Sequence, residues 1–224
     1  MDESTHKVAP EPSNTLAGGD AAPSVNIVVV LLGVLGGATA AAAAVGYYGT
    51  DKFFSVGYAP KQPVEYSHRL HAGELGMDCR YCHSTVERSG FAAVPPTQTC
   101  MNCHSKIRTE STKLLPVRES WATDQPIPWV KIHNLPDYVY FDHSAHLAAG
   151  VGCSSCHGRV DQMVKVQQVA PLSMSWCLEC HRNPTPNLRP KDQVTNMSWT
   201  PDQAPAGWQA PKVNPPVNCS GCHR

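Results

Sequence analysis

Residues 79–83 read Cys-Arg-Tyr-Cys-His, and the pattern Cys-x-x-Cys-His recurs at 100–104, 153–157, 177–181 and 219–223. The five copies contain all 10 cysteines of the 224-residue chain. This spacing is typical of c-type haem attachment, in which two thiols bond to the haem vinyl groups and the next histidine coordinates the iron. The sequence therefore predicts five covalently bound haem c groups. The predicted attachment residues are Cys79, Cys82, Cys100, Cys103, Cys153, Cys156, Cys177, Cys180, Cys219 and Cys222. The predicted proximal iron ligands are His83, His104, His157, His181 and His223.

Zinc sites and disulfides also use cysteine pairs. A structural zinc site normally takes two Cys-x-x-Cys pairs, so five pairs would leave one over. Disulfides agree with an even number of cysteines in an exported protein. Neither use explains why a histidine follows the second cysteine in every copy, since the chain has only 11 histidines. The pattern favours haem attachment.

An internal repeat precedes the first and third motifs. Residues 66–83 read YSHRLHAGELGMDCRYCH, and residues 141–157 read FDHSAHLAAGVGCSSCH. Each begins with an aromatic residue followed by two histidines three positions apart, which share one face of a helix. We expect one imidazole of each pair to bind the nearer haem and the other to bind a neighbour. The predicted distal iron ligands are His68, His71, His143 and His146.

Five haems need one further distal ligand. His133, in a proline-bracketed loop, is one candidate. A methionine is the alternative and would raise the potential of its haem, and Met174 and Met163 are the best placed. The pairing of distal ligands with haems does not follow from the sequence. Every iron has a possible sixth ligand, however, which favours electron transfer over catalysis at an open iron.

Residues 25–48 (VNIVVVLLGVLGGATAAAAAVGYY) are almost wholly apolar. About 20 apolar residues span the hydrocarbon core of a bilayer, so this segment predicts a transmembrane helix. A cleaved signal peptide is the alternative, but its apolar region is shorter, and Lys7 is the one Lys or Arg before the segment. We expect a single-pass anchor in the bacterial inner membrane. Covalent haem attachment then places the following domain on the periplasmic side.

The fold class follows from the small number of residues available for each haem. Such a chain cannot build a conventional apolar core around every cofactor. Its 20 prolines and 16 glycines also interrupt long regular elements. We therefore expect a mainly α and irregular fold: one N-terminal transmembrane helix and a multihaem cytochrome c domain of short helices and long loops, with the haems forming the core. The expected divisions are a cytoplasmic tail (1–24), the transmembrane helix (25–48), the periplasmic pentahaem domain (51–224), dihaem modules (about 64–108 and 139–183), a proline-rich strap (184–218) and a C-terminal haem site (219–223).

Charge and catalytic patterns exclude other classes. Lys plus Arg and Asp plus Glu both number 18, and no basic run occurs, which argues against a nucleic-acid partner. No acidic, basic or nucleophilic residues occur at the spacing of a known catalytic motif, so we predict no catalytic residues. The chain alone is predicted to be an electron carrier, not an enzyme.

Longer blocks of the sequence resemble a known family. YSHRLHAGELGMDCRYCH, VPPTQTCMNCH, YFDHSAHLAAGVGCSSCHGRVDQM and PLSMSWCLECHRNP are similar to the pentahaem subunit of bacterial alternative complex III, a quinol:electron-acceptor oxidoreductase. The resemblance covers about residues 25–224. It implies one transmembrane helix, a periplasmic haem domain and mixed bis-His and His/Met ligation. The implied partners are an iron–sulfur subunit, a monohaem cytochrome subunit, polytopic quinol-binding subunits, and a periplasmic cytochrome c or terminal oxidase as acceptor.

Two other functions remain open from the sequence. A stand-alone quinol dehydrogenase would feed periplasmic reductases without polytopic partners. A haem reductase would need a five-coordinate, high-spin iron. Co-purification with membrane subunits and the spin state of the haems distinguish these readings from an electron-relay subunit.

Overall fold

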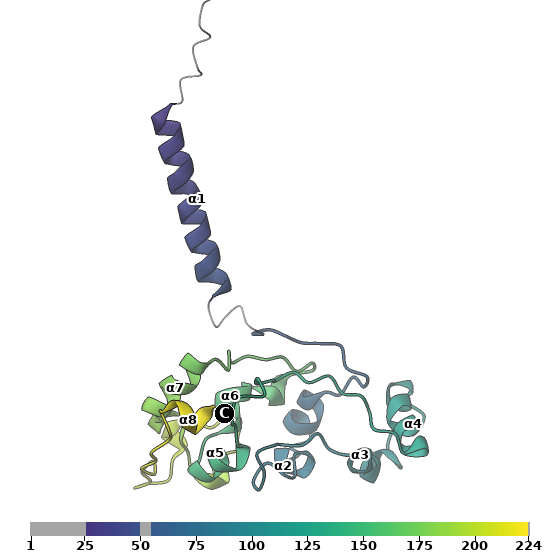
Figure 1. The fold of residues 1–224 in the computed structure, drawn as a ribbon. Coiled ribbons are helices and arrows are strands. Elements are labelled where there is room, and N and C mark those ends of the chain that lie inside the picture. The colour runs from purple at the N-terminus through teal and green to yellow at the C-terminus, as the bar shows by residue number, and fades with distance from the viewer. Residues whose placement is uncertain (1–25, 50–54, 224) are drawn as a thin grey trace, which may run out of the picture. The chain divides into compact units, whose positions relative to one another are not determined.

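The computed structural model describes residues 26–49 and 55–223 and divides the chain after Gly46 into two compact units. The first unit holds most of helix α1, Ile27–Tyr48 (Figure 1). Helix α1 has 22 residues, an 18-residue window of it has a mean hydropathy of 2.3, and none of its described side chains is buried. Among the described residues it is the one helix long and apolar enough to cross a membrane. Its length and composition fit a membrane anchor and also a signal sequence.

The second unit, Tyr47–Arg224, consists of short helices joined by long loops (Figure 1). The α-helices are α2 Cys79–Cys82, α3 Thr97–His104, α4 Leu115–Thr123, α5 His143–Ala149, α6 Cys153–His157, α7 Met174–Arg182 and α8 Cys219–Cys222. The π-helix η1 is Arg69–Glu74, and the 3₁₀ turns are η2 Thr112–Leu114, η3 Val160–Gln162, η4 Thr185–Asn187, η5 Lys191–Gln193 and η6 Pro201–Gln203. The described part of the chain has no β-strand, only isolated bridges. The predicted fold class is confirmed.

Polar caps and prolines determine where these helices begin. The Asp78 carboxylate accepts a hydrogen bond of 2.8 Å from the backbone N–H of Arg80 at the start of α2. The Asp142 carboxylate accepts one of 2.8 Å from the backbone N–H of Ser144 at the start of α5. Such caps satisfy N–H groups that have no partner within the helix. Frequent prolines, which lack this N–H and disfavour helix interiors, keep the helices short.

The apolar core of the described residues is small. Its buried hydrophobic side chains are Val64, Val86, Val117, Ala170, Leu188, Val194 and Trp199. No large described side chain is completely buried, and Phe91 is 78% exposed. A domain of this size normally buries far more of its apolar surface. The small core fits a fold in which covalently bound cofactors supply much of the apolar interior.

The proline-rich strap packs onto the third motif. It supplies three of the buried hydrophobic residues: Leu188, Val194 and Trp199. The backbone N–H of Arg189 donates to the carbonyl of Gly150 at 2.9 Å, and that of Cys153 donates to Val194 at 3.0 Å. This part of the strap is therefore fixed to the protein and is not a loose linker to the last motif.

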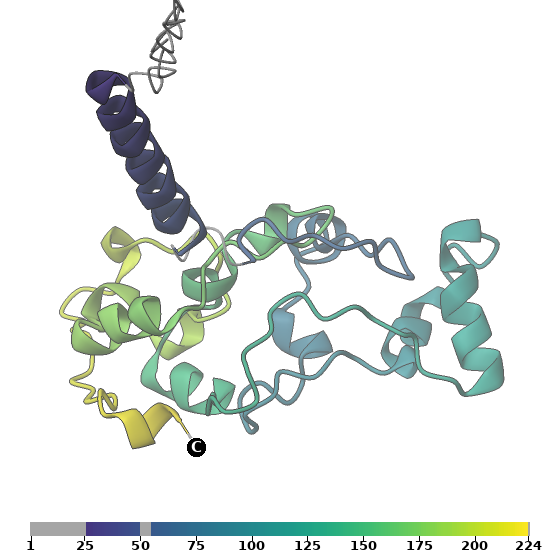
Figure 2. The same cartoon turned by 45° about the horizontal axis from the view of Figure 1, so that its top comes forward.

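The two repeat segments contact the opposite half of the unit in equivalent ways. The backbone N–H of Arg69 donates to the carbonyl of Met163 at 2.9 Å, and that of Ser144 donates to Ser89 at 3.3 Å. Arg69 and Ser144 hold the same position in the repeat. Met163 and Ser89 each lie six residues after a motif histidine. Figures 1 and 2 both show α3 and α4 together at one end of this unit and α7 and α8 at the other.

Candidate haem-binding sites

Each Cys-x-x-Cys pair lies on about one turn of helix, so its two thiols lie on the same face. The backbone N–H of His83 donates to the carbonyl of Cys79 at 2.9 Å, and that of His223 donates to Cys219 at 2.8 Å. All 10 thiols are free. Within the described residues, no three Cys, His, Asp or Glu side chains converge on a direct metal site. Each motif therefore fits a group that bonds to two thiols and one imidazole.

Most of the predicted ligand histidines orient their rings in one way. Six of them donate a hydrogen bond from Nδ1 to a backbone carbonyl, which fixes the neutral tautomer and leaves the Nε2 lone pair for a metal. The Nδ1–O distances are 2.9 Å for His71, 2.8 Å for His83, 3.0 Å for His104, 2.8 Å for His143, 2.7 Å for His146 and 2.7 Å for His181. Both distal and proximal candidates share the arrangement. It is the orientation that iron ligation through Nε2 requires.

The two repeat segments hold their paired histidines alike. In each, the aromatic ring is perpendicular to the first histidine and stacked on the second. The ring-centroid distances are 4.8 and 4.4 Å in residues 66–71, and both are 4.7 Å in residues 141–146. The sequence repeat is therefore also a structural repeat, even though the first segment continues as a π-helix and the second as an α-helix.

The second histidine of each pair faces the motif histidine of the same module. The ring centroids of His71 and His104 are 6.3 Å apart, and those of His146 and His181 are 6.1 Å apart. Two imidazoles that bind one iron from opposite sides, each at about 2 Å from the metal, have centroids roughly 6 Å apart. Both separations fit opposite ligands of one iron.

His157 has two predicted distal ligands beside it. The His143 ring lies at 6.4 Å and within 7° of parallel, and the His133 ring lies at 4.5 Å and 81°. The Nε2 atom of His133 is buried without a hydrogen-bond partner. Burial and the surrounding histidines lower the pKa of His157 to about 3, which keeps its imidazole neutral near pH 7. His133 and His143 are both positioned as candidates at this motif.

His68 is the half-buried distal candidate of the first module. Its pKa is lowered to about 4 by burial and then by His83 and His71, so it is also neutral near pH 7. Its Nδ1 atom is buried without a partner. By analogy with the second module, His68 is positioned to serve the first motif.

The remaining candidates are less enclosed. Met174 is the first residue of α7 and is 64% exposed. Met163 follows η3, and its carbonyl accepts the Arg69 bond described above, one residue from His68. The aromatic ring beside His223 is that of Tyr138, at 5.9 Å and 32°. Tyr138 was not expected from the sequence. Its position follows from the bridge between Val139 and His223.

Electrostatic interactions between thiols indicate which motifs are neighbours, and together they order the five motifs in a row. The Cys82 thiol has its pKa raised by burial and then by Cys100, which indicates that the first and second motifs are neighbours. Interaction with the Cys153 thiol lowers the pKa of Cys79, which indicates that the first and third motifs are neighbours. The last two links join the third motif to the fourth and the fourth to the fifth. Burial, Cys180 and Cys177 raise the pKa of Cys156 to about 11. Burial and then Cys222 raise the pKa of Cys177.

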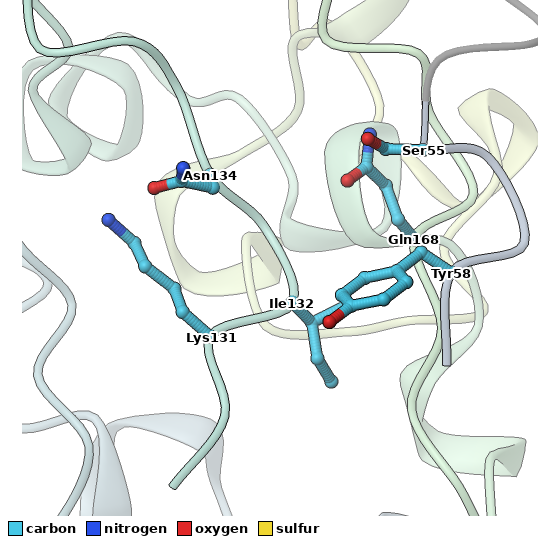
Figure 3. A pocket seen from close by; sticks show the side chains of 6 residues that line it. All are labelled: Ser55, Tyr58, Lys131, Ile132, Asn134 and Gln168. Carbon is cyan, nitrogen blue, oxygen red and sulfur yellow. The ribbon is translucent and has the colours of Figure 1, made fainter. Parts of the chain in front are cut away.

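A cavity of about 310 Å³ lies beside the His133 loop (Figure 3). Its lining residues are Ser55, Tyr58, Lys131, Ile132, Asn134 and Gln168. Figure 3 shows these side chains around an open space, with Tyr58 next to Ile132. None of the predicted thiols or iron ligands lines this cavity, so it is separate from the motifs.

Comparison with known families covers the C-terminal part of the chain. Residues 139–224 match the family "Cytochrome c7 and related cytochrome c". This segment is cytochrome c7-like. It contains three of the five motifs, at 153–157, 177–181 and 219–223, and the likeness implies covalently bound haem c. The N-terminal boundary of the cytochrome c7-like segment coincides with the start of the second predicted module.

One curated relative extends the comparison. The chain is 35% identical over 98 residues to the "Menaquinone reductase, multiheme cytochrome c subunit" of Nitratidesulfovibrio vulgaris. The match covers 43% of this chain and 46% of the relative, so it spans less than half of either protein. The chain is thus similar to a multihaem subunit of a quinone-linked enzyme, in addition to its cytochrome c7-like segment.

Proposed function

We propose that this chain is a membrane-anchored pentahaem cytochrome c that transfers electrons in a quinone-linked respiratory complex. The observation that carries the proposal is the shared Nδ1-to-carbonyl bond, which leaves Nε2 available in six predicted ligands. The two opposed pairs near 6 Å support it independently. When bound, haem c supplies one-electron chemistry at its iron.

The chain's own residues suggest how each site is completed. His71 would oppose His104, His146 would oppose His181, and His68 would serve the motif of His83. His133 or His143 would complete the motif of His157. The motif of His223 would be completed by one of three remaining candidates: whichever of His133 and His143 does not serve His157, Met163, or Met174. Backbone carbonyls fix the tautomers of six of these histidines, and burial lowers the pKa of His68, His133, His146 and His157.

The row of motifs suggests where electrons enter and leave. Its spatial order is 100–104, 79–83, 153–157, 177–181 and 219–223, according to the interactions between thiols. The second and fifth motifs therefore lie at the two ends. We propose that one end faces the electron donor and the other faces the acceptor.

Alternative complex III is the proposed setting. The sequence blocks resemble its pentahaem subunit, and α1 has the length of a single-pass anchor. In this setting the haem domain is periplasmic, and the partners are iron–sulfur, monohaem and polytopic quinol-binding subunits. Electrons from quinol would pass to a periplasmic cytochrome c or terminal oxidase. The chain itself supplies no catalytic residues.

Electron transfer in the opposite direction, from the haems to quinone, is a second candidate function and is favoured by one observation. The relative at 35% identity is described as a menaquinone reductase subunit, in which quinone is the electron acceptor. The same row of motifs would then deliver electrons to the membrane.

The test uses the full chain purified from membranes in mild detergent. Intact-mass analysis after denaturation should show five covalent haems, and low-temperature EPR should show low-spin iron only. Co-purification with polytopic subunits and quinol-dependent reduction of the haems should follow. Fewer than five haems, or one high-spin iron per chain, would contradict the proposal. Haem oxidation by added quinone, without reduction by quinol, would select the second candidate.

A further inference from the structure

Arg189 is a buried cation for which the described residues provide no anionic partner. The residue is 6% exposed. Nη1 donates to the carbonyl of Asn196 at 2.9 Å, and Nη2 donates to the hydroxyl of Ser154 at 3.2 Å. Both acceptors are neutral, and none of the ion pairs within the described residues includes Arg189. A guanidinium stays protonated in proteins, so its charge is retained.

The surroundings of this guanidinium are apolar and rich in donors. Its central carbon lies 5.0 Å from the ring centroid of Trp199. Nε of Arg189 and Nε1 of Trp199 are both buried donors that find no partner among the described residues. Such an environment does not neutralise a charge, and burying one without a counter-charge lowers stability. These contacts hold the guanidinium in place without cancelling its charge.

Arg189 is adjacent to the third motif. An added Cβ on Gly152, the residue before Cys153, would overlap the guanidinium. Ser154, which accepts the Nη2 bond, lies inside the motif itself. The Cys153 thiol interacts electrostatically with Arg189. After haem attachment this sulfur is a neutral thioether, so the positive charge remains uncompensated.

We propose that the uncompensated charge of Arg189 raises the reduction potential of the haem c held by Cys153 and Cys156. This inference rests on the proposed attachment of haem at that motif. One-electron reduction lowers the charge of the site by one unit, and no bond is formed or broken. A fixed positive charge nearby in a medium of low polarity favours the reduced state. The electron comes from the neighbouring haem in turnover and from dithionite in a titration.

Spectropotentiometric titration of the full chain in detergent measures the haem reduction potentials and so tests the effect of the Arg189 charge. Arg189→Met keeps the length of the side chain and removes the charge, so one of the five potentials should fall. The expected change is roughly tenfold in that haem's redox equilibrium, or about 59 mV for a one-electron couple. Arg189→Lys keeps the charge, so its potential should differ from the wild-type potential by less than a third of that shift. Arg182→Met is the matched control, because Arg182 is exposed and follows the motif histidine His181 directly.

A second variant leaves Arg189 in place. Ser154→Asp puts a carboxylate where the Nη2 bond ends, neutralises the guanidinium and should lower the same potential. This variant decides the matter if Arg189→Met does not fold. Unchanged potentials in both variants would overturn the inference, and so would an equal fall in Arg189→Lys and Arg189→Met.

The haem count separates this inference from the proposed function. Intact mass is measured first on each variant. A wild-type chain without haem at residues 153–157 would overturn the proposed function and the inference together. A fully loaded wild-type chain with unchanged potentials in the variants would overturn the inference alone.

Discussion

Replacing Gly152 with alanine should destabilise the fold through Arg189. Gly152 has φ −76° and ψ 144°, which alanine adopts without strain. The new Cβ would overlap the guanidinium, so Arg189 must leave its position. It would then lose its bonds to Asn196 and Ser154. Hydrogen bonds to charged groups contribute about 1.5–3 kcal/mol each, so the loss is about 3–6 kcal/mol before rehydration of the guanidinium offsets part of it. We expect a net loss of about 3 kcal/mol.

A double-mutant cycle checks this reasoning. Urea unfolding of the full chain, followed by far-UV circular dichroism, gives the free energy of unfolding of each variant. In Arg189→Ala the space beside Gly152 is free, so adding Gly152→Ala should cost little further. The expected coupling energy is therefore about 3 kcal/mol. If the two single effects add to within about 0.5 kcal/mol in the double variant, the contact inferred between Gly152 and Arg189 is wrong.

Three further predictions concern the ligands and the caps. His71 and His146 hold the same position in the two repeat segments, so His71→Met and His146→Met should each raise one haem potential in a redox titration, since His/Met ligation favours the reduced iron. Unchanged potentials would show that neither histidine is a ligand. At least one of His133→Ala and His143→Ala should produce a high-spin EPR signal, because one of them is the proposed ligand opposite His157. A signal in one variant alone identifies that ligand, a signal in both means that the other histidine completes a further site, and two low-spin spectra would exclude both histidines as ligands. Hydrogen bonds from Arg80 lower the pKa of Asp78 to about 2. The stability that the Asp78 carboxylate contributes is therefore complete above about pH 4 and is lost as the pH falls towards 2. Asp78→Asn should remove this part of the acid dependence in urea titrations at several pH values, and an unchanged pH profile would count against the interaction.

Much of the fold could be predicted because the chemistry is local in sequence. A Cys-x-x-Cys-His motif needs only one turn of helix, and the spacing of His143 and His146 specifies one helix face. The predicted helix over residues 25–48 is observed as Ile27–Tyr48, since an apolar run of that length has few other conformations. Short helices and absent strands follow from the prolines and glycines.

The parts that could not be predicted depend on contacts between distant segments. Nothing in the sequence states that Cys79 lies against Cys153, or that His133 lies beside His157. Arg189 was not singled out because a lone arginine in a proline-rich stretch is usually exposed. Tyr138 was missed for a similar reason, since only the bridge to the C-terminal motif brings it to His223.

The row of motifs has a consequence for biogenesis. The chain emerges from the ribosome in the order of its sequence, yet the first motif packs against the third and the repeat segments bond across the two halves. Part of the surface that covers residues 79–83 is therefore made after this motif. Under the proposed function, haem attached there at that stage would stay exposed until residues 141–199 are made.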